Sequence, residues 1–204
     1  MPTLLAISCS PRGPYSTSRK LTEHFVAKWS ARNHDGRVVV RDVSTPVLPF
    51  VDLPWIAGAF TPPETHSPEV AAAIEVSNEL VSELNGADHI VLGLPMYNFS
   101  IPASLKAYVD HVVRIGVTVG VDNKGLITGK RMTTIMSSGG DYTPGSPAEG
   151  YNVAIPYLRQ VFGFIGITDM TVVLAGGSRA VDQGELTLEA FAARYDAQVA
   201  AAVA

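Results

Sequence analysis

Three short stretches of the chain carry the residue types that bind small ligands through neutral hydrogen bonds. Residues 95–99 read Pro-Met-Tyr-Asn-Phe, and residues 137–140 read Ser-Ser-Gly-Gly. Residues 10–18 contain four serine and threonine hydroxyl groups, which belong to Ser10, Ser16, Thr17 and Ser18. Hydroxyl groups bind phosphate without adding charge, aromatic and amide side chains suit a flat polar ring, and paired glycines let backbone N–H groups approach a ligand closely.

The hydroxyl-rich stretch lies between a predicted strand and a predicted helix. Residues 3–8 form a short apolar run, and residues 19–32 have Leu21 and Phe25 at helical spacing, with Ser18 as the expected N-cap. A helix N-terminus binds phosphate readily because its N–H groups are unpaired and carry a partial positive charge. We interpret the stretch as an anion site; the alternative is a serine-rich turn that only caps the helix.

Other phosphate-binding motifs are absent from this stretch. It contains neither the Gly-x-x-x-x-Gly-Lys-Ser/Thr motif of nucleoside triphosphate sites nor Gly-x-Gly-x-x-Gly. Cys9 has no arginine six residues later, which argues against a phosphatase loop with a cysteine nucleophile. Because Cys9 is the only cysteine, an internal disulfide is impossible and no metal site is expected.

The second stretch follows the most continuous apolar run in the chain. Residues 90–94 are apolar, and Pro95 must end the strand because proline has no N–H group for the ladder. Unbroken apolarity predicts a strand buried on both faces, as in a parallel sheet covered by helices. The turn at residues 96–99 then lies where open parallel sheets bind ligands. The alternative is a core strand followed by a turn that binds nothing.

The fold class follows from the alternation of strand and helix along the whole chain, which predicts an α/β doubly wound parallel sheet. The flavodoxin-like strand order 2-1-3-4-5 places residues 10–18 beside residues 95–99, with residues 137–140 on the far flank. The expected strands are residues 3–8, 37–41, 90–94, 130–137 and 167–175. The expected helices are residues 19–32, 67–86, 102–113, one that begins near residues 152–155, and 185–203.

Length and composition limit the function classes. The 204 residues are expected to form a single domain, residues 1–204, and 47% of them are hydrophobic. The net charge of −4 shows no basic footprint for nucleic acid. No uninterrupted apolar segment approaches the ~20 residues that span a bilayer, and no secretory signal is visible, so we expect a cytoplasmic protein without a membrane partner.

One long connection does not fit a plain surface loop. Residues 44–67 contain five prolines together with Phe50, Trp55 and Phe60. This segment, the arm, is interpreted as packing on a partner subunit; the alternative is a loop whose aromatic residues cap their own domain. His111 lies off the apolar stripe of its predicted helix and is expected at the surface or at an interface.

Together these motifs resemble a known family. Residues 95–99, residues 16–18, residues 137–140 and the sequence of residues 163–169, Gly-Phe-Ile-Gly-Ile-Thr-Asp, are similar to the FMN-dependent NADH:quinone oxidoreductases, also called azoreductases. The similarity runs nearly end to end. Two departures leave the choice of substrate and of NADH or NADPH open: Ser138 stands where well-known bacterial members often carry arginine, and residues 119–124 lack an aromatic residue.

The resemblance implies a role for each stretch and a homodimer with active sites at the interface. Ser10, Ser16, Thr17 and Ser18 would bind the FMN phosphate. The isoalloxazine would be held by Pro95, Met96, Tyr97, Asn98 and Phe99 from one loop and by Ser137, Ser138, Gly139 and Gly140 from the other. Asn98 would hydrogen-bond the N5 or pyrimidine edge, and Phe99 and Phe164 would form walls of the substrate pocket.

The implied reaction is a ping-pong transfer of two electrons from NADH or NADPH, through FMN, to a quinone or an azo compound. Backbone N–H groups at Gly139 and Gly140 would stabilise negative charge on the reduced flavin, and no acid or base residue is needed because water can protonate the product. Two other classes remain open: a flavodoxin-like electron carrier that turns over no small substrate, and a binding module without flavin.

Overall fold

The computed structural model describes residues 1–204, and a five-stranded parallel sheet forms its centre. The strand order is β2-β1-β3-β4-β5, which confirms the predicted order. All seven residues of the central strand β3 are buried, as its unbroken apolar run predicts. The strands are β1 (Thr3–Ser8), β2 (Arg37–Asp42), β3 (His89–Pro95), β4 (Arg131–Ser137) and β5 (Asp169–Ala175).

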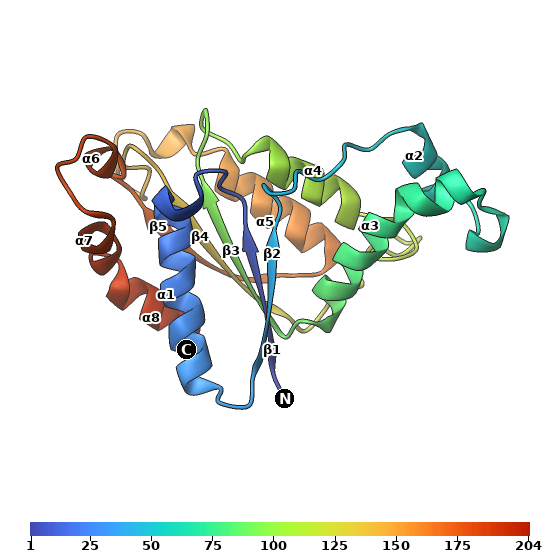
Figure 1. The fold of residues 1–204 in the computed structure, drawn as a ribbon, viewed down its shortest axis with the longest axis horizontal. Helices are drawn as coiled ribbons and strands as arrows, with labels where there is room; N and C mark the ends of the chain where they lie inside the picture. Colours follow the sequence, from blue (N-terminus) through green and yellow to red (C-terminus); the bar gives the residue numbers. More distant parts are fainter.

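Helices cover both faces of the sheet, so the molecule has three layers (Figure 1). The larger core joins the sheet to three helices: α3 (Pro68–Gly86), α4 (Ala103–Val112) and α5 (Ala154–Ile165). The smaller core lies under three helices on the other face: α1 (Thr17–Arg32), α7 (Leu188–Ala193) and α8 (Asp196–Val203). None of these helices combines the length and the hydropathy that a membrane crossing requires.

The start of α1 differs from the prediction by two residues. Ser16, and not Ser18, is the N-cap: its Oγ accepts a hydrogen bond from the Arg19 N–H at 3.3 Å. Ser18 lies inside the first turn, fully buried, with its Oγ 3.1 Å from that of Ser16. The sequence left the cap ambiguous because Ser16, Thr17 and Ser18 are all good capping residues.

Glycine in β3 lets α1 approach the sheet closely. A Cβ atom built at Gly93 would clash with Thr22 Oγ1 on α1. The helix therefore lies directly against β3, and its N-terminus reaches the edge at which the strands end. Only glycine permits this approach without displacing the helix.

The sequence predicted one helix over residues 185–203, and that prediction is wrong, because two short helices, α7 and α8, occupy this range. A further short helix, α6 (Arg179–Asp182), precedes them. The helical conformation is interrupted at Arg194 and Tyr195, and the Tyr195 hydroxyl donates to the Gly176 carbonyl oxygen at 2.8 Å. Because α7 and α8 both pack on α1, the apolar spacing continues across the interruption. The sequence pattern therefore gives no sign that the helix is interrupted.

The arm contains a helix that the sequence analysis did not predict, α2 (Leu53–Phe60). Asp52 caps it, since its Oδ1 accepts from the Trp55 N–H at 2.9 Å. The helix packs on α3 at Gly58, where an added Cβ would lie 3.0 Å from the Ile74 Cβ. Figure 1 shows the arm projecting from the body of the molecule on the side of α3 and α4.

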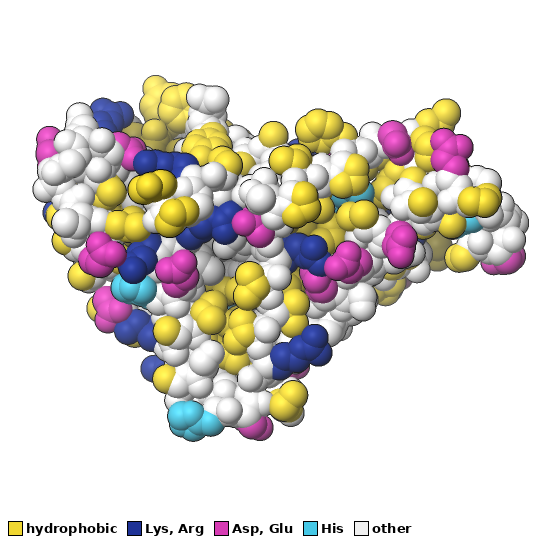
Figure 2. Space-filling view, viewed as in Figure 1, with side chains coloured by type: hydrophobic (Ala, Val, Ile, Leu, Met, Phe, Trp, Pro, Cys, Tyr) yellow, Lys and Arg dark blue, Asp and Glu magenta, His cyan; other side chains and the backbone are white.

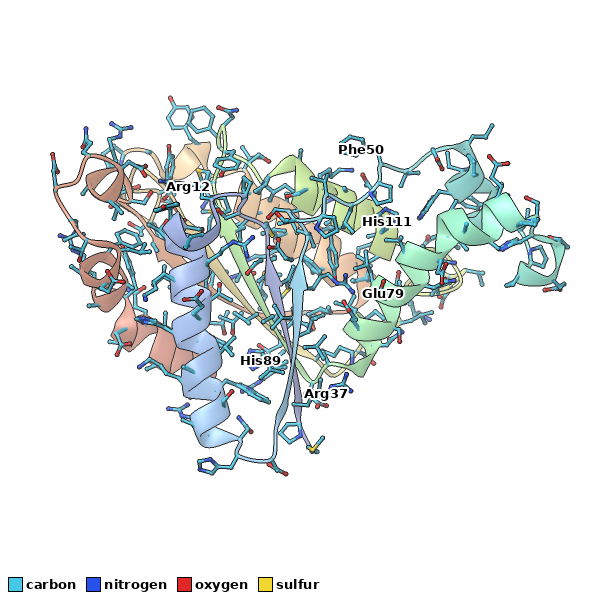
Figure 3. The ribbon with its side chains drawn as sticks, viewed as in Figure 1. Arg12, Arg37, Phe50, Glu79, His89 and His111 are labelled. Carbon is cyan, nitrogen blue, oxygen red and sulfur yellow. The ribbon has the colours of Figure 1, made fainter.

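His111 anchors this arm to α4, and its predicted exposure is wrong. The side chain is fully buried beneath the segment that carries Phe50 (Figure 3). Its Nδ1 accepts from the Trp55 Nε1–H at 3.0 Å, and its Nε2 lies 2.9 Å from the Pro49 carbonyl oxygen, to which it donates. These partners assign the neutral ring protonated at Nε2. The helical stripe did not predict the burial because the arm, not the sheet, covers this side of α4.

A second buried histidine makes the stability of the fold depend on pH. His89 packs edge-on against Phe25, and its Nε2 lies 3.0 Å from Thr133 Oγ1. Burial, together with the smaller effect of the Arg131 charge, lowers the pKa of His89 to about 4, and the Asp169 charge partly opposes this. The unfolded chain therefore binds a proton near the ordinary pKa of about 6.5, whereas the folded chain stays neutral until about pH 4.

We therefore expect the free energy of unfolding to fall as the pH falls from about 6.5 to about 4, by less than about 1.4 kcal/mol per pH unit from this group. Urea denaturation across that range measures it. His89→Gln should flatten this part of the profile. Parallel pH profiles for the two proteins would contradict the assignment.

Candidate functional site

The three stretches that the sequence predicts to bind a ligand meet at the carboxyl edge of the sheet, where β1, β3 and β4 end (Figure 1). Two hydrogen bonds join them at Ser137. The Thr17 Oγ1–H donates to Ser137 Oγ at 2.9 Å, and the Met96 N–H donates to the Ser137 carbonyl oxygen at 2.8 Å. Loops that are about 120 residues apart in sequence thus share one buried contact.

Hydroxyl groups concentrate at the N-terminus of α1. Ser10, Ser16, Thr17, Ser18 and Ser137 are all buried. Thr17 and Ser18 occupy the first turn of α1, whose N–H groups have no acceptor within the helix. The helix end therefore combines partial positive charge with neutral donors, which is the environment that a phosphate group prefers.

Both Arg12 and Arg19, which lie near this helix end, form ion pairs with carboxylates. Arg19 donates to the Ser10 carbonyl oxygen through Nε at 2.8 Å and forms an ion pair with Asp42 at 2.6 Å. Burial would raise the pKa of Asp42, but hydrogen bonds from Ser44 and Arg19 outweigh it and lower the pKa. Arg12, which Figure 3 labels at the top of α1, pairs with Asp182 at 2.7 Å. A phosphate here would be held mainly by hydroxyl and N–H groups.

Cys9 is not a nucleophile in this site. Its side chain is completely buried below the hydroxyl cluster, and burial raises the pKa of the thiol far above its usual range. A thiolate would therefore not form at neutral pH, and covalent catalysis through cysteine is excluded.

The turn after β3 holds two residues in a strained backbone conformation. Asn98 and Phe99 have φ angles of 47° and 69°, a left-handed pair that non-glycine residues seldom adopt. The turn closes on itself, because the N–H groups of Tyr97 and Ser100 each donate to the other's carbonyl oxygen at 3.0 Å. Strain of this kind, on the order of 1–3 kcal/mol per residue, concentrates at ligand-binding positions. Asn98 and Phe99 project from the turn and are exposed.

Aromatic rings surround this turn, and two of them were not predicted. The Phe99 ring lies 5.4 Å from the Tyr151 ring and 6.4 Å from the Tyr142 ring, measured between centroids. The Val153 N–H donates to the Phe99 carbonyl oxygen at 3.1 Å, which fixes the start of α5 beside the turn. Both tyrosines follow the glycine pair in a loop rich in glycine and proline, and that aromatic enrichment was the available signal.

Phe164 is not brought to this cluster. It lies ten residues beyond Ala154 on α5, so it is about 15 Å along the helix from the end that contacts Phe99. Within one chain Tyr142 and Tyr151 lie beside Phe99, and the role of Phe164 as a wall of the substrate pocket stays a prediction.

The glycine pair after β4 leaves open space at the edge of the site. An added Cβ at Gly139 would have only the Arg179 Cβ nearby, at 4.0 Å. Ser138 fixes the loop, because its Oγ donates to the Gly140 carbonyl oxygen at 2.9 Å and its N–H donates to Ala175 at 3.0 Å. The loop is therefore anchored, while backbone at Gly139 remains accessible to a ligand.

The geometry suits a phosphate group at the end of α1, beside an edge with room for a flat ring. Comparisons with known proteins identify the fold and the family. A family described as having a flavodoxin-like fold matches residues 2–199.

Individual relatives match the chain over almost its full length. An FMN-dependent NADH:quinone oxidoreductase 2 from Jannaschia sp. is 48% identical over 99% of both chains. An FMN-dependent NADH:quinone oxidoreductase 8 from Burkholderia lata is 50% identical over 94% of this chain and 93% of its own. An azoreductase from Bacillus anthracis str. Sterne superposes with a TM-score of 0.85 at 27% identity and covers 100% of this chain and 99% of its own. The chain belongs to the family of FMN-dependent NADH:quinone oxidoreductases.

Proposed function

We propose that this protein uses FMN to transfer two electrons from NADH to quinones, and that azo compounds are alternative acceptors. The observation that carries the proposal is the identity of about half of all residues, over nearly the whole chain, with relatives named for this activity. The fold and the three converging loops support it independently, because they bring the residues proposed to hold the phosphate and the ring to one edge of the sheet.

The residues at the site fit FMN in both parts. The buried hydroxyls and the α1 N-terminus would hold the phosphate; these residues are Ser10, Ser16, Thr17 and Ser18. The ring would lie between the two loops formed by Pro95, Met96, Tyr97, Asn98 and Phe99 and by Ser137, Ser138, Gly139 and Gly140. The accessible backbone at Gly139 leaves room for a planar group to approach.

When bound, FMN supplies the two-electron redox chemistry, and the chain supplies position and electrostatics. The backbone N–H groups of Gly139 and Gly140 would stabilise negative charge that develops on the ring; one such donor is worth ~3–4 kcal/mol in other enzymes. The Asn98 side chain is exposed at the turn, so it is free to orient the polar edge of the ring.

Phe99, Tyr142 and Tyr151 would offer aromatic surface to the nicotinamide and quinone rings. In this proposal the residues that contribute to catalysis are Asn98, Gly139 and Gly140, because they contact the polar edge of the ring. No side chain is required as an acid or a base.

We also infer that the single domain, residues 1–204, acts as a homodimer in the cytoplasm. Large hydrophobic side chains of the arm are exposed to solvent: Leu53 by 77%, and Phe50 and Phe60 each by 72%. Figure 2 shows hydrophobic side chains over the arm and along the upper rim of the molecule. Patches of this kind favour a subunit interface, and a single reduced cysteine suits a reducing compartment.

The reaction is tested by anaerobic titration of the FMN-loaded protein with NADH, followed by benzoquinone. We expect NADH to bleach the visible flavin absorbance and benzoquinone to restore it. Double-reciprocal plots of steady-state rate against NADH concentration, at several benzoquinone concentrations, should give parallel lines, as a ping-pong mechanism requires. A protein that binds FMN but is not reduced directly by NADH would be an electron carrier, and the proposal would be wrong.

Gly139→Ala tests the ring site. The φ angle of Gly139 is not in the left-handed region and the new methyl group meets no close neighbour, so the fold should be unchanged. The methyl group would occupy space needed by the ring and weaken FMN binding about tenfold, ~1.4 kcal/mol. Gly150→Ala is the matched control, because it also has open surroundings. Equal FMN affinity for both variants, measured by flavin fluorescence quenching, would remove Gly139 from the site.

Phe60→Ser tests the interface. Sedimentation equilibrium should show a dimer for the parent protein and a shift toward monomer for Phe60→Ser, because the variant removes exposed apolar area from the arm. Val40→Ser, at a side chain that is also 72% exposed but lies on β2, should leave the dimer unchanged. A monomeric parent protein would refute the interface.

A further inference from the structure

The outer edge of β5 carries hydrogen-bonding groups that nothing in the chain pairs. β5 bonds only to β4, and the Ser138 N–H donates to the Ala175 carbonyl oxygen, so Ala175 faces β4. Backbone groups alternate in direction along a strand, so those of Met170, Val172, Leu174 and Gly176 face outward.

Side chains cap the two ends of this outer edge but not its middle. The Arg159 Nη1–H donates to the Met170 carbonyl oxygen at 3.2 Å, and the Tyr195 hydroxyl donates to that of Gly176 at 2.8 Å. Between them, the outward N–H and C=O groups of Val172 and Leu174 have no partner. The two N–H and two C=O groups of these residues therefore alternate along the edge without partners, in the pattern with which an added strand would pair.

This stretch of edge lies at the bottom of a groove of about 840 Å³. One wall is α5, with Ile155 and Arg159, and the other comes from the start of α8, with Tyr195 and Gln198. Figure 1 shows α5 and α8 on opposite faces of the sheet, so β5 is recessed between them. The edge of a second folded sheet would meet these helices first, whereas a single extended chain needs only the ~4.8 Å of one strand spacing.

Charge is distributed unequally along the groove. Arg159 stands at the Met170 end. Asp141 and Glu149 line the groove, and Asp141 lies at the Gly176 end, where its Cα is 3.1 Å from the position of a Cβ added to Gly176. A peptide antiparallel to β5 would therefore place its C-terminal carboxylate at Arg159 and a basic residue near the two carboxylates.

We propose that the groove beside β5 binds an extended peptide with a free C-terminal carboxylate, which adds antiparallel to β5 and pairs with Val172 and Leu174. The outer edge from Met170 to Gly176 is about 20 Å long, which accommodates five or six residues. The groove contains none of the residues proposed to hold FMN, but it shares Tyr142 with the proposed aromatic surface for the substrate rings, and its end wall, residues 141–144, directly follows Gly139 and Gly140. The other edge strand, β2, has no such groove, and its Val40 is 72% exposed.

Fluorescence anisotropy of a labelled hexapeptide, Lys-Val-Thr-Val-Thr-Val with a free carboxylate, tests the site on the FMN-loaded protein without NADH. We expect saturable binding below ~1 mM. Amidation of the peptide C-terminus, and Arg159→Gln in the protein, should each weaken binding about tenfold. Arg32→Gln, an exposed arginine on α1, is the matched control and should bind the peptide normally.

Two backbone-methylated peptides test strand addition itself. One carries N-methyl groups at its second and fourth residues, and the other at its third and fifth. Because alternate N–H groups of a strand face opposite sides, one of these peptides should lose binding and the other should retain it. Absence of saturable binding, equal effects of the two methylation patterns, or full affinity of the amidated peptide would overturn the proposal. Since the assay measures no turnover, each of these results leaves the proposed reaction unaffected.

Discussion

The backbone of β3 is buried on both faces and both edges, and this constraint determines where the site lies. A buried strand must pair all its N–H and C=O groups, so β1 and β4 flank it in parallel. Parallel strands end at the same edge of the sheet, and three loops therefore meet there. The hydrogen bond from Thr17 to Ser137 depends on this arrangement, and so does the approach of α1 to the sheet over Gly93.

At this edge the molecule combines rigid support with the unpaired N–H groups of the α1 terminus. Arg12 and Arg19 are paired with carboxylates, so the proposed anion would be held by the hydroxyls and the α1 terminus. The strained turn at Asn98 and Phe99 is closed by reciprocal hydrogen bonds and by the start of α5. Strain that is supported from outside in this way pre-organises side chains for a ligand, so little ordering is needed on binding.

The two edge strands of the sheet, β2 and β5, have different surroundings. Beyond β2, the arm is attached to α4 through the buried His111 and presents apolar side chains to solvent, as a subunit interface requires. Beyond β5, two helices recess the edge and two side chains cap its ends. Capping and recession both protect an edge strand from pairing with other sheets. The same features make the unpaired middle of β5 selective for a single extended chain.

The sequence by itself determined the α/β class, the strand order, the helix start at Ser67 and the three loops, because apolar runs, capping residues and Pro95 are local signals. Only the tertiary structure decided the burial of His111, the helix α2 in the arm, the interruption at Tyr195, the cap at Ser16, and the placement of Tyr142 and Tyr151 beside Phe99. Each of these depends on contacts between residues distant in sequence. A local pattern carries no information about which distant segment will cover a side chain or accept its hydrogen bond.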